Sequence, residues 1–189
     1  IEDSAELKIR NDNLVRLEAS PASPTQGKPV TIRELVINSL RMRPDRIIVG
    51  ECRGSEAFDM LVAMNTGHEG SMTTVHANSA RETLRRLEGM ILMTGVDLPI
   101  KVVRQNISGA INVVVFIQRQ PDGVRRIVEI LEVGGMEGDT ILTQPIFQHT
   151  SAKGFHTTGF VPSFVKIFQE KGVQFPPDFF ADLYVIRHQ

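Results

Sequence analysis

The chain has 189 residues, enough for one good-sized domain or for one domain with a small appendage. Hydrophobic residues make up 41% and charged residues 23%, as in an ordinary soluble globular protein, and the formal net charge of -1 gives no reason to expect a nucleic-acid partner. The single cysteine excludes an intramolecular disulfide and favours a reducing compartment, and no apolar run approaches the roughly 20 residues of a membrane span.

The first part of the sequence predicts short strands, a loop and a helix. The end of a strand and a turn are expected over residues 1–7, a second short strand over 15–18, and a proline-rich loop over 20–29. Thr31 and Glu34 have the T-x-x-E spacing of a capping box, and apolar residues recur after them at helical spacing. We therefore expect a helix that begins after Thr31 and ends before Pro44.

Residues 46–51, RIIVGE, are the most informative segment of the chain. An apolar run leads directly into the carboxylate of Glu51, which predicts a buried parallel strand ending in an acid. In open α/β folds, ligands bind at the carboxyl edge of the sheet. The elements expected next are a helix over 55–65, another buried strand over 71–75, a helix from Ser79 to about Gly95 with Glu82 in its capping box, and a helix over 99–108.

The pattern changes after these helices. Three strand candidates follow, joined by turn-like connections: residues 111–117, 125–133 and 140–147. The fold class predicted is therefore α/β, with a mixed sheet, flanking helices and antiparallel hairpins at the end. We expect a domain over residues 1–148 and a tail over 149–189. The tail holds a short amphipathic helix near Phe164 and an aromatic patch from Phe175 to Tyr184.

Two groups of acids are candidates for chemistry. Glu51 is either an acid at the start of the following helix, stabilised by the helix dipole, or an acid that holds a Mg²⁺-bound water or orients the attacking water in nucleotide hydrolysis. Glu2 and Asp3 are either part of a solvated acidic turn or a carboxylate pair that activates water.

His68 and His76 flank the strand predicted over 71–75. A lone histidine is more often structural than catalytic, and the spacing fits no common zinc pattern. The other interpretation is that the imidazoles reach a phosphate, or acids near it, from the edge of the sheet. Arg53 follows Glu51 by two positions, and a guanidinium there can pair with an acid or with phosphate oxygens.

The sequence has no phosphate-binding loop. Gly27 and Lys28 look like the end of one, but Pro29 follows the lysine and no glycine stands five residues before Gly27. A phosphate loop needs G-x-x-x-x-G-K-[S/T] between a strand and a helix. The chain therefore supplies acids, histidines and arginines without the loop that cradles phosphates.

Three motifs in this order resemble a known family: IEDSAEL at 1–7, LVINSLRMRPDRIIVGECRGSEAFDMLVAMNTGHEGSMTTVHANS at 35–79, and RRLEGMI at 85–91. They are similar to the ATPases of the type II/type IV secretion superfamily. Within it, the chain most resembles the assembly ATPases of tight-adherence (Flp) pili, over residues 1–147 and including the DGVRR and GMEGD turns.

The resemblance implies the C-terminal part of a RecA-like P-loop ATPase core. It also implies a hexameric ring, cytoplasmic and peripheral at the inner membrane, that uses ATP and Mg²⁺ and acts on inner-membrane platform proteins of a pilus or secretion system. By this resemblance, Glu2 is the aspartate-box acid that activates water, with Asp3 beside it. Glu51 is the Walker B acid that supports Mg²⁺ through water, and Arg53 is the arginine that follows it. The histidine box consists of His68 and His76.

The family's phosphate loop and N-terminal domain lie upstream of the aspartate box, and neither occurs in this sequence. We therefore expect the chain to be part of a longer motor ATPase that drives pilus assembly or protein secretion, and the isolated chain to be inactive. Two alternatives stay open: a non-catalytic interaction or assembly module, and a metal hydrolase that uses His68, His76 and nearby acids.

Overall fold

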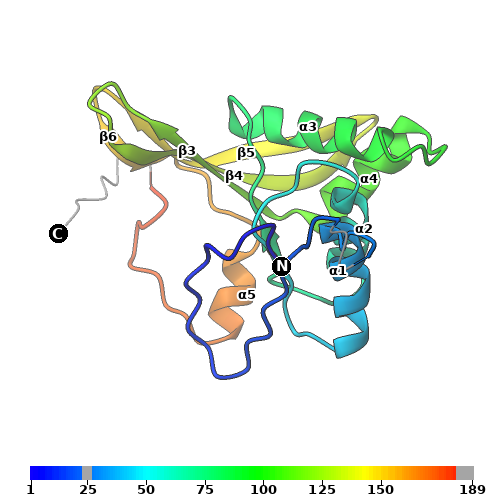
Figure 1. Ribbon diagram of the computed structural model, residues 1–189. Helices are drawn as coiled ribbons and strands as arrows, with labels where there is room; N and C mark the ends of the chain where they lie inside the picture. The colour runs from blue at the N-terminus through cyan, green and yellow to red at the C-terminus, as the bar shows by residue number, and fades with distance from the viewer. Residues whose placement is uncertain (23–26, 182–189) are drawn as a thin grey trace. The chain divides into compact units, whose positions relative to one another are not determined.

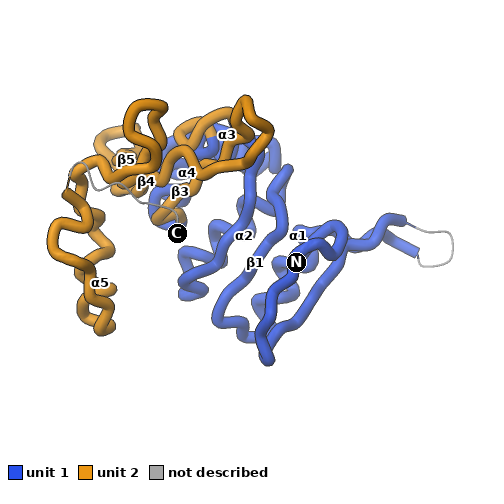
Figure 2. The backbone as a smooth tube through the Cα atoms, turned by 90° about the vertical axis from the view of Figure 1, so that its left-hand side faces the viewer, with its two compact units in different colours: residues 1–77, 83–110 blue, residues 78–82, 111–189 orange. Residues whose placement is uncertain are grey.

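A computed structural model describes residues 1–22 and 27–181 (Figure 1). The chain divides into two compact units, one of residues 1–77 and 83–110, the other of residues 78–82 and 111–189 (Figure 2). The elements that lie wholly or mostly in the first unit are α1 (Ile32–Ser39), the 3₁₀ helix η1 (Leu40–Met42), β1 (Ile48–Val49), α2 (Glu56–Asn65), β2 (Met72–Thr73), α3 (Ala80–Leu92) and α4 (Ile100–Ala110).

Short parallel segments form the sheet of the first unit. β1 pairs with β2 in parallel. The Gly50 N–H donates to the Ile1 carbonyl oxygen at 2.8 Å, so the N-terminal segment also lies beside β1, and Glu2 forms a parallel bridge with Glu18. The carboxyl ends of parallel strands meet at one edge of a sheet, so the residues that follow Glu2, β1 and β2 come to the same edge.

The capping signals in the sequence place two helix starts correctly. The Thr31 hydroxyl accepts from the Glu34 N–H, and the Glu34 carboxylate accepts from the Thr31 N–H, so the predicted capping box is complete. At the start of α3 the Ser79 hydroxyl accepts from the Glu82 N–H, but the Glu82 carboxylate accepts from the N–H of Asn78. In this second capping box the Glu82 carboxylate therefore binds the N–H of Asn78, one residue before the expected N–H of Ser79.

β2 differs from the prediction. The sequence predicted a buried strand over residues 71–75, but β2 covers only Met72–Thr73 and Met72 is 54% exposed. Within the described part of the chain β2 pairs only with β1, so one of its edges has no neighbouring strand. The expectation of burial is therefore wrong for this strand.

The helices of the first unit are joined by polar contacts around an apolar core. Arg33 of α1 pairs with Asp59 of α2 at 2.6 Å. Glu88 of α3 binds Arg104 of α4 through both carboxylate oxygens, at 3.0 and 3.2 Å. Fully buried side chains fill the space between these elements: Val36, Val49, Met60, Leu61, Ile91, Val103 and Ile107. This packing fixes α2, whose first turn faces the candidate site.

The second unit contains an antiparallel sheet with strand order β3-β4-β5-β6. Its elements are β3 (Val113–Arg119), β4 (Arg125–Glu137), β5 (Thr140–Thr150), β6 (Gly154–Thr157) and α5 (Val165–Glu170). The three predicted strands and the tail helix are confirmed, whereas β6 was not predicted. Phe175, Phe179 and Phe180 of the predicted aromatic patch contact one another, and Tyr184 lies outside the described residues.

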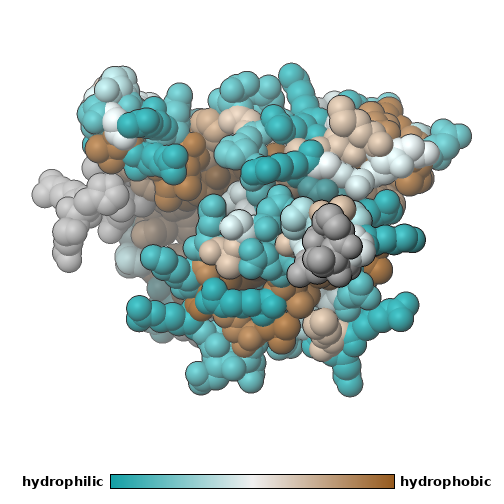
Figure 3. Space-filling view, in the orientation of Figure 1, coloured by the Kyte–Doolittle hydropathy of each residue, from teal (hydrophilic) through white to brown (hydrophobic). Residues whose placement is uncertain are grey.

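Apolar and hydrophilic side chains are mixed on the face seen in Figure 3. Some large apolar side chains are exposed on helices and turns, among them Met42, Met93 and Val161. Across residues 1–22 and 27–181, no helix has the length and hydropathy to cross a membrane.

Candidate functional site

Three chain segments bring polar side chains to the carboxyl edge of the parallel sheet. Asp3 follows the N-terminal segment, Glu51 comes two residues after the end of β1, and His76 comes three residues after the end of β2. The Thr74 hydroxyl donates to the Gly50 carbonyl oxygen at 2.6 Å, which holds the ends of β1 and β2 together. Strand pairing thus brings residues that are far apart in the sequence to one edge of the sheet. Glu51 lies at the carboxyl end of its strand, as the sequence predicted.

Glu51 is at the centre of this cluster. Its Oε2 lies 2.6 Å from Nη2 of Arg53, and its Oε1 lies 3.0 Å from Nε2 of His76. Nη1 of Arg53 lies 3.8 Å from Oδ2 of Asp3. The Glu51 side chain is 20% exposed, whereas those of Arg53 and His76 are 67% and 81% exposed. The mostly buried carboxylate of Glu51 therefore contacts two exposed side chains, Arg53 and His76, whose nitrogen atoms a ligand can reach.

The pKa of Glu51 lies below the usual value of a glutamate. The hydrogen bond from Arg53 is the largest cause; partial removal from water opposes it, and the charges of Arg53, His76 and Arg86 add to the lowering. Glu51 is therefore ionised at neutral pH, which suits it to accept hydrogen bonds from a water and not to donate a proton. The helix-start interpretation of Glu51 does not fit, because α2 begins at Glu56.

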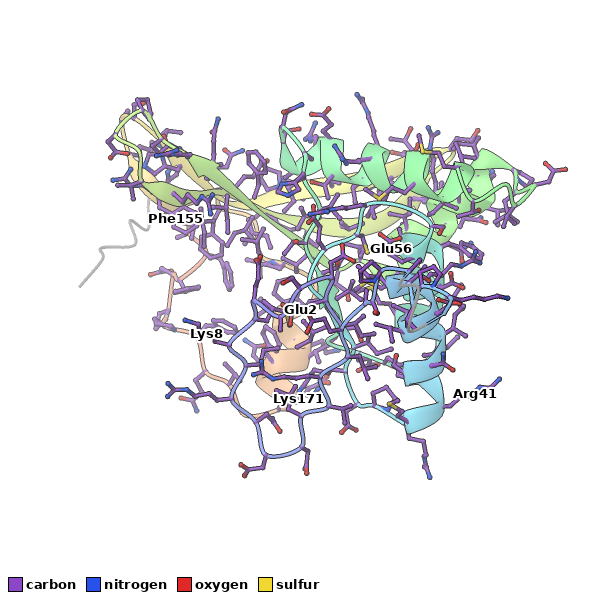
Figure 4. The ribbon with its side chains drawn as sticks, in the orientation of Figure 1. Glu2, Lys8, Arg41, Glu56, Phe155 and Lys171 are labelled. Atoms are coloured by element: carbon purple, nitrogen blue, oxygen red, sulfur yellow. The ribbon has the colours of Figure 1, made fainter. Side chains whose placement is uncertain are left out.

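Glu2 is fixed by its own loop. Its Oε1 accepts hydrogen bonds from the N–H groups of Glu6 at 2.9 Å and Leu7 at 2.8 Å. Removal from water raises the pKa of Glu2, but these two donors, with smaller contributions from nearby positive charges, hold it below its usual value. Because both bonds are made to Oε1, Oε2 is the oxygen that can accept from a water. The carboxylate comes from the N-terminal segment, as Figure 4 shows.

His68 is placed away from the other predicted site residues by the chain topology. It precedes β2, whereas His76 follows it, so the two histidines lie at opposite edges of the parallel sheet. The Nδ1 of His68 is 3.0 Å from the Ala63 carbonyl oxygen near the C-terminus of α2. The structure therefore brings Asp3, Glu51, Arg53 and His76 together, and it gives His68 a contact with the end of a helix.

Sequence reasoning missed Glu56. This residue is only 9% exposed, and its Oε1 accepts from the N–H groups of Arg53 at 2.5 Å and Gly54 at 2.8 Å. The signal that could have found it is an acid in the first turn of a helix directly after the loop that carries Arg53. Its carboxylate lies at the start of α2, where Figure 4 labels it.

An open cleft of about 700 Å³ adjoins the cluster. Asp3, Arg53 and Glu56 lie along it, together with the start of α1. The other lining residues are Ala19, Ser20, Pro21, Pro29, Val30, Thr31, Ile32, Arg33, Gly54 and Ser55. The cleft gives the Asp3–Arg53 pair access to ligands from solvent.

The side chains around Glu51 fit a magnesium ion held through water. Mg²⁺ takes hard oxygen ligands, keeps several waters and is bound by one or two carboxylates plus substrate phosphates. Glu51 supplies such a carboxylate, but both its oxygens already have partners in Arg53 and His76, so contact through a water suits it better than direct ligation. Within residues 1–22 and 27–181, no group of three or more His, Cys, Asp or Glu side chains is arranged to hold a metal ion.

Cys52 is buried beside this loop and takes no part in the cluster. It is 1% exposed, its sulfur lies 3.7 Å from that of Met60, and it accepts a hydrogen bond from the Thr73 hydroxyl at 3.4 Å. Burial raises the pKa of the Cys52 thiol to about 11. The thiol is therefore protonated at neutral pH and packs as a small apolar group.

Acids, an arginine and a histidine thus meet at the carboxyl edge of the parallel strands, the edge at which open α/β folds bind ligands. Residues 1–145 match the family described as "Type II/IV secretion system protein", and the chain belongs to this family.

Relatives and a solved structure agree with this assignment. The chain is 43% identical over 138 residues to a putative conjugal transfer protein of Mycobacterium tuberculosis, covering 73% of this chain and 39% of that protein. It is 35% identical over 144 residues to the conjugal transfer protein TrbB of Rhizobium radiobacter, covering 76% and 41%. The chain thus spans about two fifths of the length of these relatives.

The crystal structure of the VirB11 ATPase from the Brucella suis type IV secretion system, in complex with sulphate, resembles the chain with a TM-score of 0.52. The two are 36% identical, and the match covers 55% of this chain and 33% of that one. The predicted fold class, part of a RecA-like α/β core, is therefore confirmed.

Proposed function

We propose that the chain is the C-terminal part of a motor ATPase that hydrolyses ATP to drive pilus assembly or secretion. The observation that carries the proposal is the Glu51 carboxylate, held between Arg53 and His76 at the carboxyl edge of the sheet. Support comes from the family of the chain and from relatives named for conjugal transfer and type IV secretion. The tight-adherence pilus ATPases are the subfamily that its motifs resemble most.

Phosphoryl transfer needs mainly positioning and charge stabilisation from a protein. In this proposal the ionised Glu51 would hold Mg²⁺ through a water, and Arg53 balances the charge of Glu51 and Asp3. Mg²⁺, when bound, would neutralise charge on the phosphate oxygens. Glu2 orients the attacking water through Oε2, because Oε1 is occupied by its own loop. His76 is exposed beside Glu51 and can donate to a phosphate oxygen from this edge.

The wider setting follows from the resemblance to the secretion ATPases. We propose that the full-length protein forms a homo-oligomeric, hexameric ring, is cytoplasmic and peripheral at the inner membrane, and contacts inner-membrane platform proteins. ATP would be cradled by a phosphate loop that this sequence does not contain. The isolated chain is accordingly proposed to be inactive, whereas the full-length protein is an ATPase.

The test uses the full-length protein with the region that precedes Ile1. Glu51→Gln keeps the shape of the side chain but removes its charge, so we expect much slower ATP hydrolysis with ATP binding retained. The control is Glu137→Gln, an exposed acid at the end of β4 in the second unit, which should leave both unchanged. Near-normal turnover in Glu51→Gln removes Glu51 from the mechanism, and absence of G-x-x-x-x-G-K-[S/T] upstream of Ile1 contradicts the ATPase assignment.

A further inference from the structure

Glu56 binds the backbone of the loop that presents Arg53. One carboxylate oxygen, Oε1, accepts from the Arg53 N–H at 2.5 Å and from the Gly54 N–H at 2.8 Å. Ser55, at the N-cap position of α2, makes no capping hydrogen bond through its side chain. Glu56 therefore binds two backbone N–H groups just before the helix, those of Arg53 and Gly54, to which the N-cap side chain does not bind.

The anchored backbone matters because the Arg53 side chain is long and largely exposed to solvent. That side chain is 67% exposed, and a long exposed arginine loses rotamer freedom when it is held in one geometry. Its guanidinium nevertheless lies 2.6 Å from Glu51 and 3.8 Å from Asp3. Glu56 is 9% exposed and belongs to a helix whose Ala57, Met60 and Leu61 are buried, so it connects this exposed group to a fixed part of the core.

We propose that Glu56 is a positioning residue, which holds the Arg53–Gly54 backbone so that the Arg53 guanidinium stays between Asp3 and Glu51. As a role in ATP hydrolysis, this rests on the function proposed above. Glu56 does not touch the nucleotide in this proposal, and it acts only through Arg53. A carboxylate that merely stabilises the start of α2 would affect stability and leave the state of Glu51 unchanged.

The first experiment measures the carboxyl titration of Glu51 directly, in the chain labelled with ¹³C at glutamate carboxyl groups. The variants are Glu56→Ala, Arg53→Ala and the double variant. We expect Glu56→Ala to raise the titration midpoint of Glu51 by most of the shift that Arg53→Ala causes, and the double variant to equal Arg53→Ala alone. Such non-additivity is the signature of two residues that act through one contact.

A matched control comes from α1. The Glu34 carboxylate also accepts a backbone N–H at a helix start, from Thr31 at 2.8 Å, but it does not contact Arg53. Glu34→Ala should therefore lower stability and leave the Glu51 midpoint unchanged. The proposal fails if the Glu51 midpoint in Glu56→Ala equals that of the wild type while Arg53→Ala shifts it.

Two further variants keep the test decisive if Glu56→Ala does not fold. Glu56→Gln retains an oxygen in the same place and should keep most of the wild-type midpoint. Glu56→Asp is one methylene shorter, so its carboxylate is withdrawn from the two N–H groups, and the midpoint should rise. Equal midpoints in Glu56→Gln and Glu56→Asp overturn the proposal.

The second experiment measures steady-state ATP hydrolysis by the full-length protein. We expect Glu56→Ala to lower kcat on the order of 10-fold, as loss of a supporting contact behind a site residue does, with KM for ATP little changed. Glu56→Gln should recover much of the loss, and Glu34→Ala should change neither constant. If the wild-type protein hydrolyses no ATP, the proposed function fails, while the titration of Glu51 still decides the role of Glu56. Unchanged kcat in Glu56→Ala contradicts the catalytic part of the inference.

Discussion

Nη2 of Arg53 lies 2.6 Å from Oε2 of Glu51, and Glu51 precedes Arg53 by only two positions in the chain. The same guanidinium reaches toward Asp3, which comes from the N-terminal segment. Two carboxylates at one sheet edge would repel each other, and the cation between them offsets that repulsion. The contact with Arg53 therefore lowers the pKa of Glu51, and the first prediction concerns its response to pH.

Glu51→Gln should weaken the dependence of stability on acid pH. The pKa of Glu51 is lowered in the folded chain, so its stabilising contribution is present above the usual value of 4.5 and is lost as pH falls through the folded pKa. The wild type should be more stable than Glu51→Gln at pH 6, and the difference should shrink toward pH 3. Urea unfolding over this pH range measures it. Glu137→Gln is the control, and a difference that stays constant with pH contradicts the prediction.

The two histidines should respond differently to substitution. In the full-length protein, His76→Ala should lower ATP turnover because His76 lies 3.0 Å from Glu51. His68→Ala loses the hydrogen bond to the Ala63 carbonyl, so its expected effect is a loss of stability of roughly 1 kcal/mol with turnover nearly unchanged. Steady-state ATPase rates and urea unfolding of both variants distinguish the two effects. The reverse pattern would place His68, and not His76, at the site.

Cys52 should be protected from thiol reagents in the folded chain. The thiol is buried and its pKa is raised to about 11, so very little thiolate forms at pH 8. An aromatic disulfide reagent, which releases a coloured thiolate when it reacts, should label Cys52 slowly in buffer and rapidly in urea. Rapid labelling of the native chain would show that the Cys52–Met60 contact opens readily.

Much of the candidate site was predictable because strand pairing follows simple rules. The RIIVGE segment indicated where Glu51 would lie, and the carboxyl ends of parallel strands brought Asp3 and His76 to the same edge. The helix at Thr31 was equally accessible, since a capping box is a local interaction among neighbours. The capping box depends on neighbours in the chain, whereas the shared edge follows from the parallel pairing of β1 with β2.

Other features depended on packing that the sequence does not show. Glu56 was missed because an acid at the start of a helix looks the same whether it faces solvent or folds back onto the preceding loop. A buried strand was predicted over residues 71–75, but Met72 is exposed, and within the described residues β2 pairs only with β1. β6 has four residues and is held through its pairing with β5, so its own sequence carries little signal.

The isolated chain should bind Mg-ATP weakly or not at all. The sequence has acids and an arginine but no phosphate-binding loop, whose backbone N–H groups and lysine would hold the phosphates. Isothermal titration calorimetry with Mg-ATP should therefore show no saturable heat in the micromolar range. A micromolar dissociation constant would mean that the described cleft beside Asp3 and Arg53 holds nucleotide without that loop.

Gly50→Ala should disturb Glu2 more than it disturbs the fold. A Cβ at Gly50 would lie 3.0 Å from Cγ of Glu2, so the side chain that is proposed to orient the attacking water must shift. We expect a cost of about 1 kcal/mol in stability, typical of mild overpacking, and a larger loss of kcat in the full-length protein. Gly89→Ala is the matched control: a Cβ there, within α3, meets nothing within 4 Å, so this change should stabilise the chain by up to about 1 kcal/mol. Urea unfolding and ATPase rates of the two variants measure both effects. Equal turnover in Gly50→Ala and the wild type would show that the position of Glu2 against β1 is not needed for hydrolysis.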